Sequence, residues 1–173
     1  MRLFSFRNPN NGRGIGVLCA KDSQQFVDLC ATDPNIPNSL LSFIENDPSL
    51  SKAKQALSNP KAVIRNLADI QFETLIDRPG KIVCMGLNYA DHAKEGGNAR
   101  PEYPSFFMRG PSSLAAHGAP LIRPSVSDKL DYEAELAFIV GKRARNLTRE
   151  NALDCIAGYS VFNDGSIRNY QRK

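Results

Sequence analysis

Two glutamates separated by one residue, Glu133 and Glu135, lie in a largely apolar stretch, residues 130–140. In a β-strand alternate side chains share a face, so both carboxylates would lie on the face that Ala137 and Ile139 continue. Because those two residues are uncharged, the face is expected to point inward, where two unpaired anions are very costly. The pattern therefore predicts a bound cation, and a hard divalent ion takes such oxygen ligands. The alternative is a strand with one face in water.

A third carboxylate, Asp164, follows a predicted strand over residues 159–163 and precedes Gly165. A carboxylate at a strand end can approach a pair on the neighbouring strand and complete a set of three oxygen ligands. The sequence Asn163-Asp164-Gly165 is also typical of a tight turn or a helix cap. The residues alone leave both interpretations open.

A candidate general base follows the apolar strand expected over residues 81–85. Asn88 can cap a short helix, and helical spacing then places His92 and Glu95 one turn apart on one face. A carboxylate in that position can orient an imidazole and favour its protonated form. The same spacing is also found in surface His–Glu contacts. Further along, Arg109 ends an aromatic strand and is either a ligand for a substrate carboxylate or a surface charge.

Composition limits the classes of protein to consider. The chain has 173 residues, 42% of them hydrophobic and 23% charged, which is typical of a soluble globular protein with one or two small domains. The net charge of +4 is spread without a basic run, so nucleic-acid binding is not indicated. The four cysteines form no CxxC pair, and no apolar run reaches membrane-spanning length. We expect free thiols, no membrane contact and a cytoplasmic setting.

The positioning elements fall into two units, residues 1–78 and 79–173, joined by a charged turn with Pro79 and Gly80. Ser39, Asn59 and Thr148 are candidate helix caps, and Gly158 is a candidate helix stop. In the first unit strands are expected over residues 3–6, 14–20 and 26–29, and helices over residues 40–45 and 62–68. In the second unit a helix is expected over residues 149–157.

Four ordered segments together resemble the fumarylacetoacetate hydrolase family: PGKIVCMGLNYADHAKE, FFMRGPSSL, DYEAELAFIVGKRARN and GYSVFNDGSIRNYQ. The resemblance implies an α+β fold, with a small N-terminal α+β unit followed by a mostly β roll with short helices. The chain stops at Lys173, where the family's catalytic domain continues, so we expect the C-terminal part of that roll to be missing. The family commonly forms dimers, so a homodimer is expected.

The same resemblance assigns roles to residues. It implies that Glu133, Glu135 and Asp164 bind Mg²⁺ or Mn²⁺, and that His92 and Glu95 activate water. It also implies that Arg109, Arg168 and Gln171 contact the substrate. Arg109 stands where many members of the family have lysine.

The implied function is that of a divalent-metal-dependent enzyme acting on small anionic 2-oxo acids such as acylpyruvates. It would hydrolyse a carbon–carbon bond or decarboxylate the substrate through a metal-stabilised enolate. One alternative is an isomerase or hydratase of 2-hydroxy-dienoate or 2-oxo-enoate acids in aromatic catabolism. Another is a catalytically inactive truncated homologue.

Overall fold

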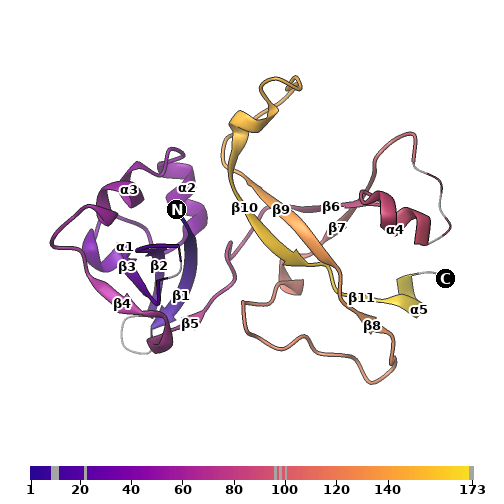
Figure 1. Ribbon diagram of the computed structural model, residues 1–173, viewed down its shortest axis with the longest axis horizontal. Helices are drawn as coiled ribbons and strands as arrows, with labels where there is room; N and C mark the ends of the chain where they lie inside the picture. The colour runs from indigo at the N-terminus through magenta and orange to yellow at the C-terminus, as the bar shows by residue number, and fades with distance from the viewer. Residues whose placement is uncertain (9–11, 22, 96, 98, 100, 172–173) are drawn as a thin grey trace.

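The computed structural model describes residues 1–8, 12–21, 23–95, 97, 99 and 101–171, apart from the side chains of His92, Ala93 and Glu95. Figure 1 shows an N-terminal group of strands and helices, followed by paired strands with few helices. The fold is α+β, as predicted. None of the helices in the described part of the chain has the length and apolar character that a membrane crossing requires.

The N-terminal unit is built on one five-stranded antiparallel sheet with the order β4-β3-β2-β1-β5. The three strands expected from the sequence are confirmed as β1 to β3, and two short strands complete the sheet. Its strands are β1 (Leu3–Asn8), β2 (Gly12–Leu18), β3 (Gln25–Asp28), β4 (Ile64–Asn66) and β5 (Gln71–Phe72). Its helices are α1 (Leu29–Thr32), α2 (Leu40–Asn46), α3 (Ser51–Leu57) and the 3₁₀ turn η1 (Leu67–Asp69).

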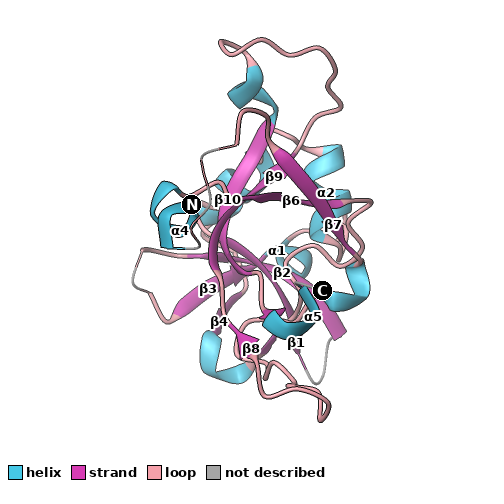
Figure 2. Ribbon diagram, turned by 90° about the vertical axis from the view of Figure 1, so that its right-hand side faces the viewer, coloured by secondary structure: helices cyan, strands magenta, loops and turns pink. Residues whose placement is uncertain are grey.

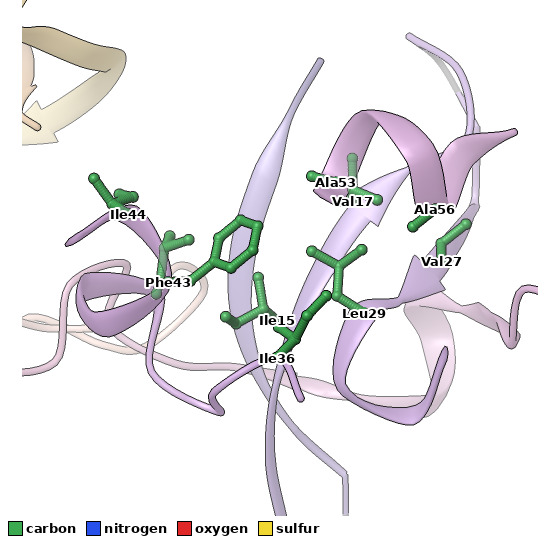
Figure 3. Close-up of a cluster of buried hydrophobic side chains, with 10 residues drawn as sticks. Ile15, Val17, Val27, Leu29, Ile36, Phe43, Ile44, Ala53 and Ala56 are labelled. Carbon is green, nitrogen blue, oxygen red and sulfur yellow. The ribbon is translucent and has the colours of Figure 1, made fainter. Parts of the chain in front are cut away.

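The main hydrophobic core lies between this sheet and its helices (Figure 3). Phe43 on α2 is 1% exposed and Ile15 on β2 is fully buried. These side chains come from the strands and helices of the first unit, and they remove a large apolar area from water. Ile139 and Ala157, from the second half of the chain, pack against the same cluster. The two halves of the chain are therefore in contact.

One predicted helix of this unit is confirmed and another is wrong. The Ser39 hydroxyl caps α2 by accepting a hydrogen bond from the Ser42 N–H at 3.4 Å. The expected helix over residues 62–68 is replaced by β4 and η1, because Asn59 accepts a local bond from the Lys61 N–H and β4 pairs with β3.

Helix α3 was not predicted. Its start is stabilised by Asp47, whose carboxylate accepts a hydrogen bond from the Lys52 N–H at 2.9 Å. Leu50, at the N-cap position, has a left-handed backbone and makes no side-chain capping bond. The chain therefore uses a capping carboxylate that lies outside the usual N-cap position.

The second half of the chain consists of three antiparallel strand pairs. Residues 82–86 pair with 105–109, 134–140 with 156–163, and 130–131 with 166–167. These strands are β6 (Ile82–Gly86), β7 (Ser105–Arg109), β8 (Leu130–Asp131), β9 (Ala134–Val140), β10 (Ile156–Asn163) and β11 (Ser166–Ile167). The helical segments are α4 (Ala90–Glu95), η2 (Pro111–Ser113), η3 (Ala152–Cys155) and α5 (Arg168–Gln171).

The helix predicted over residues 149–157 is wrong. Only η3 forms in the loop between β9 and β10, which extends away from the strands (Figure 2). The expected cap is reversed, since the Thr148 N–H donates to the Asn151 side chain at 2.8 Å. Gly158 does not stop a helix but lies inside β10, beside an irregularity in its pairing with β9. The end of the expected helix, Ile156 and Ala157, belongs instead to β10, which pairs with β9.

The strands of the second half leave large apolar side chains in water. Phe106 on β7 is 62% exposed, Phe138 on β9 59% and Val161 on β10 84%. Large apolar side chains exposed on several neighbouring positions of a strand pair, as on β9 and β10, are unusual on a monomeric soluble protein. The division of the chain at residue 78 into two domains stays a prediction.

Candidate active site

The acidic strand has the alternation that the sequence predicts. Along β9, Glu135, Ala137 and Ile139 are half-buried, whereas Leu136 and Phe138 on the other face are exposed. One detail differs from the prediction of a continuous strand over residues 130–140. The strand is interrupted between β8 and β9, so Glu133 lies in the segment that connects them. Its side chain is nevertheless only 13% exposed.

Asp164 lies directly beside this connection. The Asp164 N–H donates to the Glu133 carbonyl at 2.8 Å, and the Glu133 N–H donates to the Asn163 side chain at 3.1 Å. Phe162, two residues before Asp164, is the pairing partner of Glu135. The backbone therefore brings the three predicted carboxylate residues together, and Asp164 is 5% exposed.

The cations next to two of these carboxylates are arginines. Arg109, at the end of β7, forms an ion pair with Asp164 and also donates to the Gly165 carbonyl at 2.7 Å. Arg168, at the start of α5, lies 2.8 Å from an Asp131 oxygen and 3.0 Å from a Glu133 oxygen. The expected neutralising charge is thus supplied in part by the chain itself.

The donor chemistry of this group nevertheless fits a hard divalent metal ion. Glu133 Oε1 and Asp164 Oδ1 are buried and accept no hydrogen bond of ordinary geometry, although each lies beside a guanidinium group. Within the described residues no three His, Cys, Asp or Glu side chains are arranged to hold a metal ion. Binding by all three carboxylates therefore requires side-chain movement away from the arginines.

Cys84 is a neighbour of this cluster that sequence reasoning did not identify. Burial raises the pKa of its thiol, the nearby Asp164 and Glu135 carboxylates raise it further, and Arg109 opposes them. Cys84 lies on β6, opposite Phe107 on β7. The strand pair β6–β7 therefore forms a wall of the acidic cluster. No sequence signal marks this thiol, because the proximity depends on strand packing.

Tyr89 is a second residue that the sequence did not single out. Its hydroxyl accepts a hydrogen bond from the Leu136 N–H at 3.1 Å. Tyr89 immediately precedes α4, and Leu136 immediately follows Glu135. This bond ties the start of α4 to the acidic strand.

The predicted short helix is confirmed as α4. It carries His92 and Glu95, whose side chains lie outside the described residues. The helical backbone itself gives the spacing of one turn on which the predicted base pair depends.

The predicted substrate contacts are engaged within the chain. Besides its two carboxylate partners, Arg168 donates to the Gln171 side chain at 3.0 Å. Arg109 is bound to Asp164 and Gly165. All three residues, Arg109, Arg168 and Gln171, thus border the acidic cluster, and a role in substrate binding stays a prediction.

Comparison with known proteins gives a consistent result. The family model "Fumarylacetoacetate (FAA) hydrolase C-terminal" matches residues 81–173, more than half of the chain. An oxaloacetate tautomerase from Xenopus laevis, described as mitochondrial, is 34% identical over 174 residues, which is 100% of this chain and 54% of the relative. The chain therefore spans about half the length of this curated relative.

Solved structures show the same fold over the same share of their length. The maleylpyruvate hydrolase of Sphingobium sp. SYK-6, solved with manganese(II) and pyruvate, is 28% identical with a TM-score of 0.74, covering 97% of this chain and 60% of that one. A fumarylacetoacetate hydrolase from Exiguobacterium antarcticum is 28% identical with a TM-score of 0.69, covering 99% and 58%. On the family match and these similarities, the chain belongs to the fumarylacetoacetate hydrolase family.

Proposed function

We propose that this chain carries the metal and base residues of an enzyme that hydrolyses a carbon–carbon bond in 2-oxo acids such as acylpyruvates. The observation that carries the proposal is the hydrogen bond from the Leu136 N–H to Tyr89. It joins the helix of the candidate base, His92, to the strand of the candidate ligand Glu135. A general base and a charge-stabilising group must lie close together to act on one substrate.

In this proposal Glu133, Glu135 and Asp164 hold Mg²⁺ or Mn²⁺ through carboxylate oxygens. A divalent ion held there would polarise the 2-oxo carbonyl and favour negative charge on its oxygen. The buried oxygens of Glu133 and Asp164, which lack hydrogen bonds of ordinary geometry, support this assignment. Manganese(II) in the structure of the Sphingobium relative supports a divalent ion in the family.

The chain's own groups would then move protons. His92, oriented by Glu95, takes a proton from water, and the hydroxide adds to the acyl carbonyl carbon. The bond between that carbon and the methylene carbon of the pyruvate part breaks, and its electron pair passes to the pyruvate part as an enolate. A proton returned to the methylene carbon gives pyruvate and a carboxylic acid.

A second candidate is keto–enol tautomerisation of a 2-oxo acid. It is favoured by the 34% identity to the Xenopus laevis relative, which is described as an oxaloacetate tautomerase. The reaction uses the same enolate but only moves a proton between the carbon next to the carbonyl and the oxygen, so no carbon–carbon bond breaks. A base on α4 suits both reactions.

The deciding experiment uses the chain supplied with Mn²⁺ and a simple acylpyruvate such as acetylpyruvate, with pyruvate release as the readout. We expect release that depends on Mn²⁺ and falls at least 100-fold in His92→Ala. Lys94→Ala is the matched control, because Lys94 is an exposed neighbour on the same helix and is expected to leave the rate unchanged. Enolic oxaloacetate, followed by its absorbance, tests the second candidate.

The outcomes separate the candidates. Loss of enol absorbance without pyruvate release from acetylpyruvate would favour the tautomerase. Neither activity, with the protein folded, would favour the inactive homologue. The homodimer and the cytoplasmic setting stay predictions, which light scattering and cell fractionation measure. The mitochondrial description of the Xenopus laevis relative makes the second measurement informative.

A further inference from the structure

The charges of the acidic cluster do not balance. Among the side chains that the structure describes, it holds four carboxylates (Asp131, Glu133, Glu135 and Asp164) and two guanidinium groups (Arg109 and Arg168). Four negative and two positive charges leave two negative charges, which is the charge that one divalent cation neutralises. A half-buried site with such an excess is unfavourable until a cation enters it.

The two arginines differ in the carboxylate partners that they would keep if a metal ion bound to the predicted ligands. Arg168 keeps a carboxylate partner, Asp131, that is not a predicted metal ligand. Arg109 has no such second carboxylate in the described part of the chain, because its ion pair is with Asp164 alone. Its other contact is the neutral carbonyl of Gly165. A metal ion on Asp164 would therefore compete with Arg109 directly.

We propose that Arg109 is an exchangeable counter-ion for Asp164 that turns to the substrate when the metal ion binds. Its ion pair neutralises a carboxylate that is 5% exposed. A bound metal ion neutralises Asp164 in its place and releases the guanidinium group. The hydrogen bond to the Gly165 carbonyl keeps the released group at the site. A planar guanidinium group next to the metal is suited to bind the carboxylate of a 2-oxo acid. This inference rests on the proposed function, since it assumes that Asp164 is a metal ligand.

The test measures binding and not turnover. Mn²⁺ is titrated into the metal-free chain while the paramagnetic resonance signal of free Mn²⁺ is recorded. An adjacent arginine stabilises an ionised aspartate by a factor of roughly ten to a thousand. We therefore expect Arg109→Gln, which removes the competing cation, to bind Mn²⁺ about tenfold more tightly than wild type. Arg7→Gln removes a paired arginine far along the chain, on β1, and is the control expected to bind Mn²⁺ normally.

A second titration probes the other half of the inference. Oxalate, which presents two carboxylates as a 2-oxo acid mimic, is added to the Mn²⁺-loaded proteins. We expect Arg109→Gln to bind oxalate about tenfold more weakly, because the released guanidinium group is missing. Opposite changes in the two affinities are the signature of exchange. A merely structural arginine would weaken both.

The results separate the two proposals. If wild type binds no Mn²⁺, the proposed function fails, and this inference fails with it. If wild type binds Mn²⁺ and Arg109→Gln binds it equally or more weakly, only the exchange is overturned. Should Arg109→Gln not fold, Arg109→Lys carries the test. Its more strongly hydrated charge competes less well for Asp164, so its Mn²⁺ affinity is expected to rise, and an unchanged or lower affinity overturns the exchange.

Discussion

Replacing Tyr89 by phenylalanine removes the hydroxyl that ties α4 to the acidic strand. The Leu136 N–H, which donates to this oxygen at 3.1 Å, then has only water as a partner. The change is small in volume and leaves the ring in place, so the fold is expected to persist. The helix that carries His92 loses its hydrogen bond to the strand that carries Glu135.

The free energy lost with this hydrogen bond can be estimated from the solvent exposure of the two residues that form it. Leu136 is 66% exposed and Tyr89 is 40% exposed, so water can replace the lost partner. The net free energy of such a hydrogen bond is about 0.5–1 kcal/mol, at the lower end of the usual range. That corresponds to a factor of about two to five in an equilibrium constant.

Two assays can measure this two- to fivefold change. Amide hydrogen exchange at Leu136, followed by NMR, is expected to accelerate about two- to fivefold in Tyr89→Phe. Pyruvate release by the metal-loaded protein is expected to slow by a similar factor, with Mn²⁺ affinity unchanged. Tyr159→Phe is the matched control, because Tyr159 lies on β10 and its hydroxyl makes no hydrogen bond within the described residues.

Unchanged exchange at Leu136 would show that the hydrogen bond does not hold the helix. Faster exchange with an unaltered rate of pyruvate release would show that the bond forms but does not position the base. The second result would leave the hydrogen bond in place but remove its support for the proposed function.

Two further predictions concern the N-terminal unit, and both are measured by urea unfolding. Phe43→Ala is expected to lower the free energy of unfolding by about 3–5 kcal/mol, because the ring is 1% exposed, whereas Phe106→Ala on the exposed face is expected to change it by less than about 0.5 kcal/mol. Equal losses of stability in the two variants would show that Phe43 is not part of the main hydrophobic core. Burial would raise the pKa of the Asp47 carboxyl, but hydrogen bonds from the Lys52 N–H and the Ser49 and Ser51 groups outweigh it and lower the pKa to about 2. Since the folded pKa is lower than the ordinary value of 3.8, this stabilisation is present above about pH 4 and is lost as the pH falls toward 2. Asp47→Ala should therefore cost about 1 kcal/mol at pH 7 and much less near pH 2.5, solvent screening keeping the value low. A cost that does not vary with pH would contradict this reasoning.

Much of the site could be predicted because its signals are local. The alternation around Glu135 on β9 follows from the two-residue period of a strand, and the structure confirms that this face is the less exposed one. The helix that carries His92 follows from spacing, and it is confirmed as α4. Asp164 was predicted at the end of a strand, and β10 indeed delivers it beside Glu133.

The partners of these groups could not be predicted, because each comes from a distant segment. Arg109 reaches Asp164 only because β6 and β7 pack beside the acidic cluster. Tyr89 reaches Leu136 across a similar gap in the chain. No periodicity or short motif encodes such contacts.

The wrong predictions of secondary structure have a related origin. The residues after Asn59 have helical character, but Ile64–Asn66 pair with β3 instead, and this tertiary pairing overrides the local preference. Of the helix expected before Gly158, Ile156 and Ala157 lie in β10, which pairs with β9, and Ala152–Cys155 form the short η3. In both places pairing with a neighbouring strand replaces at least part of the local structure that the sequence favours.

An anomalous difference map from crystals soaked in Mn²⁺, recorded at the manganese absorption edge, tests the proposed metal site most directly. We expect one strong peak within about 2.0–2.4 Å of oxygens from Glu133, Glu135 and Asp164, with Arg109 moved away from Asp164. No peak there, or a peak held by other residues while Arg109 stays on Asp164, would contradict the proposal.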